Sequence, residues 1–205
     1  MRRRRAVRTA GRPRAPGTAR ARSAGGARAA ATPGARHRIE HAQCIAPEDV
    51  ARFAALGVAA SVQYTHATSD RDLVQRIWAD RIDHAYPFRS LWAAGARLAG
   101  GSDAPVEELD PLAGLRAAVL HTDSAERPPW RPEEAIPAAA ALESFTVAPA
   151  WLSFDEHRRG RLRAGFDADL VVLDGDPLAD PPASVADVRV VATMVAGGWT
   201  HSPGW

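Results

Sequence analysis

The segment RIEHAQCIAPEDVARFAALGVAASVQYTH (residues 38–66) decides the fold of this chain. It opens with a short run of strand-forming residues, RIEHAQCI, and it closes with another, VAASVQYTH. The stretch between them starts with Pro47 and two acidic residues and stops at Gly57, which are preferred signals for the two ends of a helix. Strand, helix and strand in this order predict two parallel strands joined by a right-handed crossover.

The same alternation continues along the chain. Helices are predicted at DRDLVQRIW (residues 70–78) and PFRSLWAAG (residues 87–95), and a third strand is predicted at ARLAGGSD (residues 96–103). A later helix is expected over PEEAIPAAAALESFTVAPAWL (residues 132–152). Three parallel strands with helices between them predict an α/β fold, either a piece of an open sheet or a piece of a β/α barrel.

The pattern changes in the last quarter of the chain. LVVLD (residues 170–174) and VRVVATMVAG (residues 188–197) are strand-like, and the segment GDPLADPPAS between them is rich in turn residues. These features predict a small antiparallel β unit beside the α/β part. The chain is therefore expected to divide into a basic segment, an α/β part and a β unit, at residues 1–36, 37–154 and 155–205.

The basic segment differs in composition from everything that follows. Residues 1–38 carry 12 of the 26 basic residues, all of them arginine, and no acidic residue, which leaves 14 basic against 24 acidic residues afterwards. Because so few larger apolar side chains are present, we expect this segment to be disordered. Three interpretations stay open: an arm for nucleic acid or another anionic surface, a targeting peptide, and out-of-frame or mis-started translation. The last is preferred, and nucleic-acid binding is not favoured because no aromatic residue is interleaved for base stacking.

The remaining composition is that of a globular protein, with 46% hydrophobic residues. No apolar run reaches the roughly 18 residues that a membrane span needs, and no apolar segment of the signal-peptide type follows the N-terminal arginines. We therefore expect a cytoplasmic protein without membrane contact. The single cysteine, Cys44, excludes an intramolecular disulfide and a cysteine-rich metal site.

Three polar residues fall at the ends of the predicted strands: His41, His66 and Asp103. In a β/α barrel all strands open at their C-terminal ends onto one face, so residues far apart in sequence converge there. Neutral imidazoles and a carboxylate suit a borderline divalent cation such as zinc, and a carboxylate beside a metal-activated water can take its proton. The alternatives stay open: each histidine has a structural role, and Asp103 is a turn residue that caps its own backbone.

Five successive segments resemble the C-terminal portion of amidohydrolase family 3. They are HRIEHAQ, ASVQYTHATSD, AYPFRSLWAAGARLAGGSDAPVEELDPLAGLRAAV, ALESFT and GRLRAGFDADLVVLDGDPL. The resemblance implies the C-terminal part of a (β/α)₈ barrel of the TIM type, followed by part of a small β-sandwich domain. It also implies a metal-dependent hydrolase, with zinc as the expected metal.

The resemblance further implies roles for individual residues. His41 matches the metal-binding histidine that ends the sixth barrel strand. Asp103 matches the aspartate of the eighth strand, which binds the metal and acts as the catalytic general base. His66 matches the histidine of a Q-P-x-H segment, with tyrosine here in place of proline, and is expected to contact the substrate. Tyr86 and Arg89 match an aromatic-Arg segment that is structural in the first place, and Arg89 is also a candidate substrate-binding residue.

The predicted activity is the hydrolysis of carbon–nitrogen bonds in small amide-type substrates other than peptides. The superfamily's His-x-His, its bridging lysine or glutamate and its further histidine have no counterpart before residue 37. The chain is therefore expected to be N-terminally truncated, and its activity as a separate chain is in question. The alternative is an inactive barrel fragment or interaction protein, whose open sheet edges would favour a homo-oligomer.

Overall fold

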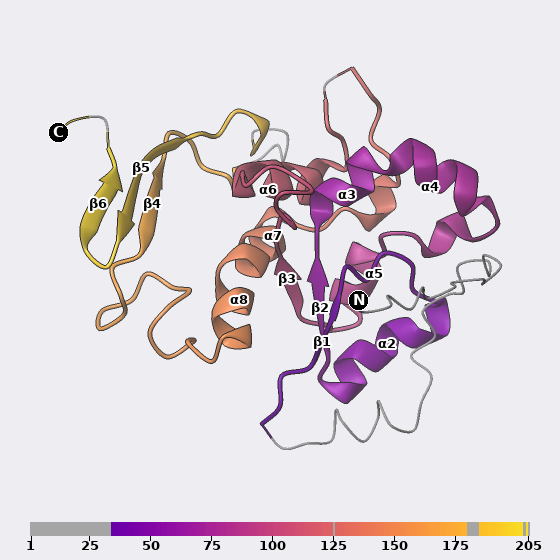
Figure 1. Cartoon of the computed structure of the whole chain (residues 1–205), viewed down its shortest axis with the longest axis horizontal. Helices are drawn as coiled ribbons and strands as arrows, with labels where there is room; N and C mark the ends of the chain where they lie inside the picture. Colours follow the sequence, from indigo (N-terminus) through magenta and orange to yellow (C-terminus); the bar gives the residue numbers. More distant parts are fainter. Residues whose placement is uncertain (1–33, 125, 180–184, 203, 205) are drawn as a thin grey trace, which may run out of the picture.

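The computed structural model describes residues 34–124, 126–179, 185–202 and 204, and these contain two separate sheets (Figure 1). The expected disorder of the basic segment concerns residues that lie almost entirely outside the described part. The same holds for residues 180–184 of the predicted turn-rich stretch.

The first sheet has three parallel strands in the spatial order β1, β2, β3. Their bounds are β1 (Arg38–Glu40), β2 (Ala59–Val62) and β3 (Leu98–Gly100). The predicted parallel pairing is confirmed by the register, in which Ala60 lies opposite Ile39 on one side and Leu98 on the other. Each strand is shorter than its sequence pattern. After β1 the backbone turns to positive φ at His41 (67°), which ends the extended conformation.

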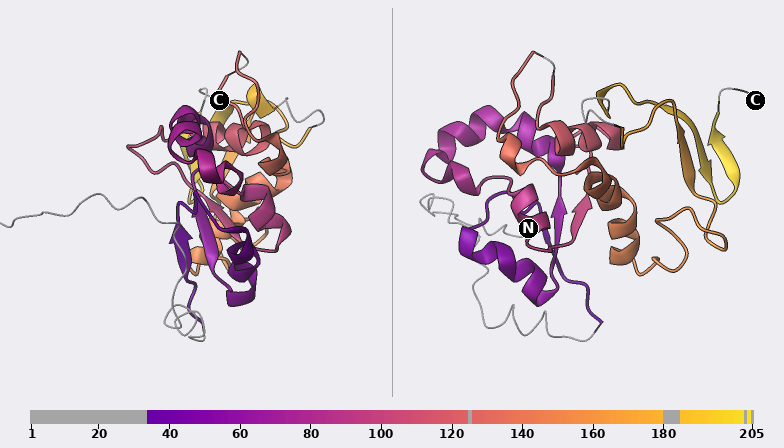
Figure 2. Two further views of the ribbon diagram at one scale, coloured as in Figure 1. Left: turned by 90° about the vertical axis from the view of Figure 1, so that its right-hand side faces the viewer. Right: turned by 180° about the vertical axis from the view of Figure 1, so that it is seen from behind.

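Helices connect these strands and pack around the sheet (Figures 1 and 2). They are α2 (Pro47–Leu56), α3 (Tyr64–Ser69), α4 (Arg71–Ile77), η1 (Ala79–His84), α5 (Phe88–Ala93), α6 (Pro111–Leu120), η2 (Pro132–Glu134), α7 (Ala138–Phe145) and α8 (Val147–Leu152). The signals read for α2 are confirmed, since Pro47 stands in its first turn and Gly57 closes it in the left-handed conformation.

The single helix predicted over residues 132–152 is wrong. The chain forms η2, then α7, then α8. Pro137 has no N–H to continue a helix and forces Ile136 away from helical geometry, so α7 starts afresh after it. Thr146 has φ −124° and ψ −72°, which separates α7 from α8. Helix α6 was not predicted from periodicity; it starts at Asp110, whose carboxylate accepts a hydrogen bond from the backbone N–H of Leu112.

A close aromatic contact joins the sheet to α6. The ring of Phe145 in α7 faces Gly100 at the end of β3 and Gly114 in α6. A Cβ atom on Gly100 would lie 2.9 Å from this ring, and one on Gly114 would lie 2.6 Å from it. The two glycines therefore give the Phe145 ring the room to pack against both β3 and α6.

The second sheet confirms the predicted antiparallel β unit. It contains β4 (Leu170–Leu173), β5 (Val190–Val195) and β6 (Gly198–His201), in that order. It lies beyond α8, to one side of the parallel sheet (Figures 1 and 2). The third strand, β6, was not predicted; it pairs with β5 across the turn at Ala196 and Gly197, which both have positive φ.

Arg36 ties the start of the described chain to α8. Its guanidinium donates hydrogen bonds to the Trp151 carbonyl and to the Glu156 carboxylate, and it lies 4.6 Å from the centre of the Trp151 ring. Arg97 lies over the same ring at 4.2 Å. Arg36 was assigned to the basic segment, but its side chain packs with the α/β part.

Among the described residues, no helix is long and apolar enough to cross a membrane.

Candidate functional site

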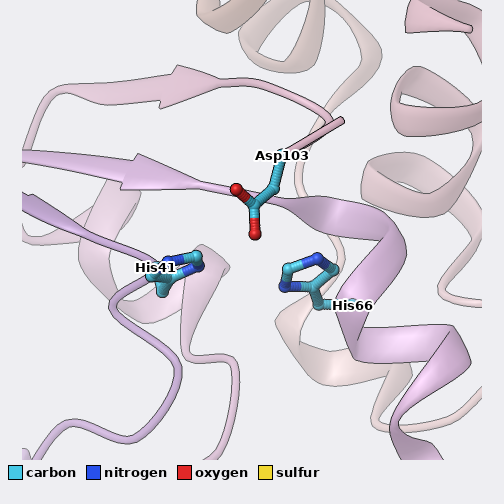
Figure 3. A group of neighbouring side chains, drawn as sticks. All are labelled: His41, His66 and Asp103. Atoms are coloured by element: carbon cyan, nitrogen blue, oxygen red, sulfur yellow. The ribbon is translucent and has the colours of Figure 1, made fainter. Parts of the chain in front are cut away.

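His41, His66 and Asp103 meet at the C-terminal end of the parallel sheet (Figure 3). Each offers one ligand atom, and these atoms all lie within 4.8 Å of one another. The Asp103 carboxylate points toward the space between the two imidazole rings (Figure 3). The structure therefore brings together the three residues that the sequence placed at the strand ends, and the reason is the parallel pairing of β1, β2 and β3.

His41 and Asp103 are held by the turns that follow their strands. His41 comes directly after β1 with φ 67°, and Asp103 lies three residues beyond β3 with φ 60°. Positive φ is uncommon for residues other than glycine, although histidine and aspartate adopt it more readily than most. Both side chains are exposed. The backbone thus aims the two side chains out of the sheet edge, where a ligand can reach them.

His66 was expected at a strand end, and the structure corrects this: it lies in α3, one turn of helix beyond β2. The strand stops at Val62, Gln63 is the last extended residue, and the helix begins at Tyr64. The alternation in VQYTH is too short to distinguish a strand end from the first turn of a helix. Unlike the other two residues, His66 is only 5% exposed.

The two histidines are stacked in this cluster. Their ring centroids lie 5.9 Å apart, and their planes differ by 13°. Nδ1 of His66 lies 3.0 Å from the side-chain amide nitrogen Nε2 of Gln43. Nε2 of His66 is buried and has no hydrogen-bond partner among the described residues. A buried polar atom without a partner is costly, so this atom is suited to a group that binds at the site.

A carboxylate next to His41 is held in its charged form. The Arg38 side chain, and after it the Ser61 hydroxyl, donate hydrogen bonds that keep the pKa of Glu40 below its usual value. The negative charge of Glu40 is balanced by Arg38, with which it forms an ion pair over 2.5 Å at the end of β1.

The donor set fits a divalent cation of the borderline type. Imidazole nitrogen and carboxylate oxygen are ligands that zinc accepts, and the donor atoms of His41 and Asp103 lie within 4.8 Å of one another, close enough to share one ion. Both of these side chains are open to solvent. The residues present therefore fit a metal centre.

Arg89 is not part of this cluster. It is an exposed residue of α5, and its guanidinium lies 5.0 Å from the centre of the Trp92 ring. Trp92 lines a different cavity of about 260 Å³, beside the start of β3. The helix turns Phe88 and Leu91 into the core, which leaves Arg89 on the outer face.

Sequence reasoning missed Gln43, whereas Tyr86 was expected to be structural in the first place. Gln43 was quoted within the HRIEHAQ segment and was given no role, yet its side-chain amide contacts His66. The available signal was a polar residue two positions after His41 in an otherwise apolar stretch. Tyr86 is fully buried, and its backbone N–H donates to the Gln43 carbonyl over 2.6 Å.

Polar side chains gathered at the C-terminal ends of neighbouring parallel strands define an α/β protein with a ligand or metal site at that end of its sheet. The comparison of the sequence with family models makes the assignment more specific. The chain belongs to the amidohydrolase family, whose model matches residues 9–201. The match begins inside the basic segment, residues 1–36.

Known relatives agree with this membership. The chain is 37% identical over 164 residues to Protein LONG AFTER FAR-RED 3 of Arabidopsis thaliana. This match covers 79% of this chain and 28% of that protein. It is 34% identical over 112 residues to the N-substituted formamide deformylase of Arthrobacter pascens, covering 55% of this chain and 20% of that enzyme. The chain thus spans less than a third of the length of these relatives.

A solved structure is similar to the fold as well. It is an uncharacterized metal-dependent hydrolase from Pyrococcus horikoshii OT3, with 30% sequence identity and a TM-score of 0.63. The superposition covers 77% of this chain and 32% of that one. The matched part of this chain therefore corresponds to about a third of that structure.

Proposed function

We propose that this chain provides part of the active site of a metal-dependent hydrolase that cleaves carbon–nitrogen bonds in amide-type substrates other than peptides. The observation that carries the proposal is the convergence of His41, His66 and Asp103 within 4.8 Å at one end of the sheet. Membership of the amidohydrolase family and the deformylase among the relatives support this class of reaction.

We propose further that the parallel sheet is three strands of a (β/α)₈ barrel and that β4 to β6 are part of a β-sandwich domain. The coverage of relatives supports this, because the chain matches only 32% of the similar Pyrococcus horikoshii structure. In a barrel the remaining strands would surround the same face and add ligands to it. A catalytic zinc normally has three protein ligands, so this chain contributes a share of the site.

In this proposal His41 and Asp103 hold the metal, for which zinc is the expected ion. A divalent ion bound there polarises a carbonyl oxygen and lowers the pKa of a water molecule. Asp103 acts as the general base: its exposed carboxylate accepts a proton as the water oxygen adds to the carbonyl carbon. When the carbon–nitrogen bond breaks, the same carboxyl group returns this proton to the leaving nitrogen, so that a carboxylic acid and an amine are formed.

His66 contacts the substrate in this scheme. Its ring is buried and pinned by Gln43, so it offers a fixed polar edge beside the Asp103 carboxylate. A fixed polar group orients the substrate carbonyl for attack without being reorganised during the reaction.

The test is zinc binding by the full chain. The protein is stripped of metal with a chelator and titrated with zinc against a competing dye. We expect the chain to bind no more than one zinc, more weakly than a site with three protein ligands would. We expect Asp103→Asn to weaken this binding by about tenfold or more, because even a change in a residue that only supports a ligand costs about 10–100-fold. Asp187→Asn, which removes an exposed carboxylate of the β unit, is the control and should leave the affinity unchanged. Absence of zinc binding in the wild type, or equal affinity in both variants, contradicts the proposal.

A further inference from the structure

The contact between Gln43 and His66 determines more than the position of a ring. Nε2 of Gln43 lies 3.0 Å from Nδ1 of His66. An amide nitrogen can only donate a hydrogen bond, so Nδ1 must accept it. A neutral imidazole that accepts at Nδ1 carries its proton at Nε2. We therefore propose that Gln43 is a positioning residue that holds His66 in the Nε2–H tautomer.

This tautomer decides which kind of group His66 presents. Nε2 is buried without a partner among the described residues, so it is a hydrogen-bond donor in need of an acceptor. A metal ion needs a lone pair instead, and both ring nitrogens of His66 are otherwise committed, one to the proton and one to Gln43. The proposal, which rests on the proposed function for its chemical meaning, is that His66 donates to an oxygen of the substrate and that His41 and Asp103 are the metal ligands.

Gln43 is itself fixed from outside the site. Its backbone carbonyl accepts a hydrogen bond from the N–H of Tyr86 over 2.6 Å. The next residue, Cys44, forms an isolated antiparallel bridge with Ala85. Tyr86 has φ 48°, a conformation that a bulky residue keeps only where its surroundings enforce it. The segment around Tyr86 thus holds the Gln43 backbone in place while the side chain reaches His66.

The hydrogen bonds close into a circuit that returns to His66. The Tyr86 hydroxyl donates to Oδ2 of Asp70 over 3.0 Å. The Asp70 backbone N–H donates to the His66 carbonyl over 3.0 Å, at the C-terminal end of α3. The ring of His66 and the helix that carries it are therefore anchored by one connected network. A network of this kind fixes both the orientation and the tautomer of an imidazole, as is known for the partners of metal-binding histidines.

The tautomer can be measured without metal or substrate. The full chain is labelled with ¹⁵N-histidine, stripped of metal and examined by long-range ¹H–¹⁵N correlation at about pH 8.5, above the ordinary imidazole pKa of about 6.5. His66→Gln assigns the signals. His121 is an internal reference of opposite type, because its Nδ1 lies 2.9 Å from the Trp130 carbonyl and must donate to it. We expect a protonated Nε2 for His66 and a protonated Nδ1 for His121.

Variants of Gln43 test the cause. In Gln43→Glu the amide donor becomes an acceptor, so we expect Nδ1 of His66 to become protonated. In Gln43→Met, which has a similar length and no hydrogen bond, we expect a mixture of the two tautomers. Gln75→Glu makes the same change at an exposed position in α4 and should leave His66 as in the wild type. Unchanged signals of His121 show that each variant is folded.

Two outcomes overturn the inference: a protonated Nδ1 on His66 in the wild type, or a His66 tautomer that is the same in wild type and Gln43→Glu. These outcomes are separate from the failure of the proposed function. If the chain shows the expected tautomer but no zinc affinity, the metal centre is contradicted and the role of Gln43 is kept. If the chain binds zinc but His66 has the other tautomer, the role of Gln43 is contradicted and the metal centre is kept.

Discussion

The imidazole rings of His41 and His66 lie stacked, with centroids 5.9 Å apart, although one ring follows β1 and the other belongs to α3. Adjacent parallel strands end at the same edge of the sheet, and this brings the two rings together. Their surroundings differ: His41 is exposed, whereas His66 is buried and bound by Gln43. This difference supports the proposal that His41 binds the metal and that His66 contacts the substrate.

These different tasks lead to a first prediction, on metal affinity. His41→Ala removes a proposed metal ligand and is expected to weaken zinc binding by about tenfold or more. Even the loss of a residue that only supports a ligand reduces metal affinity by about this factor. His66→Gln is expected to leave the zinc affinity close to that of the wild type, because the proposal assigns His66 to the substrate and not to the metal. Competition titration of both variants measures the difference, and an equal loss in the two would show that His66 is a ligand as well.

A second prediction concerns the Phe145 wedge. Alanine is a better helix former than glycine by about 1 kcal/mol, so Gly114→Ala in α6 would ordinarily stabilise the protein. Here the new Cβ would lie 2.6 Å from Cζ of Phe145, the ring atom that also lies nearest to Gly100 of β3, so the ring has little room to move away. Overpacking costs about 1–3 kcal/mol, so we expect a net loss of about 1 kcal/mol in the free energy of unfolding.

Urea unfolding of a small set of variants checks this wedge. In a Phe145→Leu background the Gly114→Ala change should lose its penalty, because the clashing ring is gone. Gly101→Ala, where a Cβ meets nothing within 4 Å, is the matched control and should be close to neutral. A Gly114→Ala protein as stable as the wild type would show that the core accommodates the methyl group.

A third prediction concerns pH and His121. Burial lowers the pKa of this imidazole, while its hydrogen bond to the Trp130 carbonyl and the nearby Glu134 act in the opposite direction. Below the unfolded pKa of about 6.5 the unfolded chain then binds more protons than the folded chain. The stabilisation from the neutral, buried imidazole is therefore fully present above a pH of about 6.5. It is lost as the pH falls from about 6.5 through the lower pKa of His121 in the folded state.

Thermal melting between about pH 5 and pH 8 measures this effect, and the melting temperature should fall toward the acidic end. His121→Asn should flatten the dependence, since asparagine tolerates the left-handed conformation found at this position (φ 49°) and carries no titrating group. His157→Asn removes an exposed imidazole and should keep the slope of the wild type. If His121→Asn keeps that slope too, the acid sensitivity arises elsewhere.

A fourth prediction concerns the anchor formed by Arg36. Its guanidinium lowers the pKa of Glu156 to about 2, and the largest cause is the hydrogen bond that it donates to the carboxylate. The stabilisation from this ion pair is present above the unfolded carboxyl pKa and is lost as the pH falls through about 2. In Arg36→Ala we expect the Glu156 pKa, followed by carboxyl ¹³C shifts, to return toward its ordinary value. The melting temperature should also fall further than in Arg76→Ala, which removes an exposed arginine of α4. An unmoved Glu156 pKa would exclude the pairing.

The sequence by itself determined the three parallel strands, the helix between the first two of them and the membership of a family. Pro47, the acidic first turn and Gly57 are local signals, and they sufficed to locate α2 between two strands. His41 and Asp103 stand at the ends of two strands that were predicted from local sequence, and this placed them at the sheet edge. Such features depend on neighbours in the chain, so they can be read without knowing the fold.

Only the tertiary structure decided what these residues touch. The sequence did not show that His66 lies in a helix. The contact of Gln43 with the His66 ring and the hydrogen bond between Tyr86 and Asp70 join residues that are well separated in sequence. The break between α7 and α8 and the wedge of Phe145 between two glycines were equally hidden. The physical reason is that periodicity reports which face of an element is apolar, whereas tautomers, pKa shifts and close packing depend on the partner that the fold brings to that face.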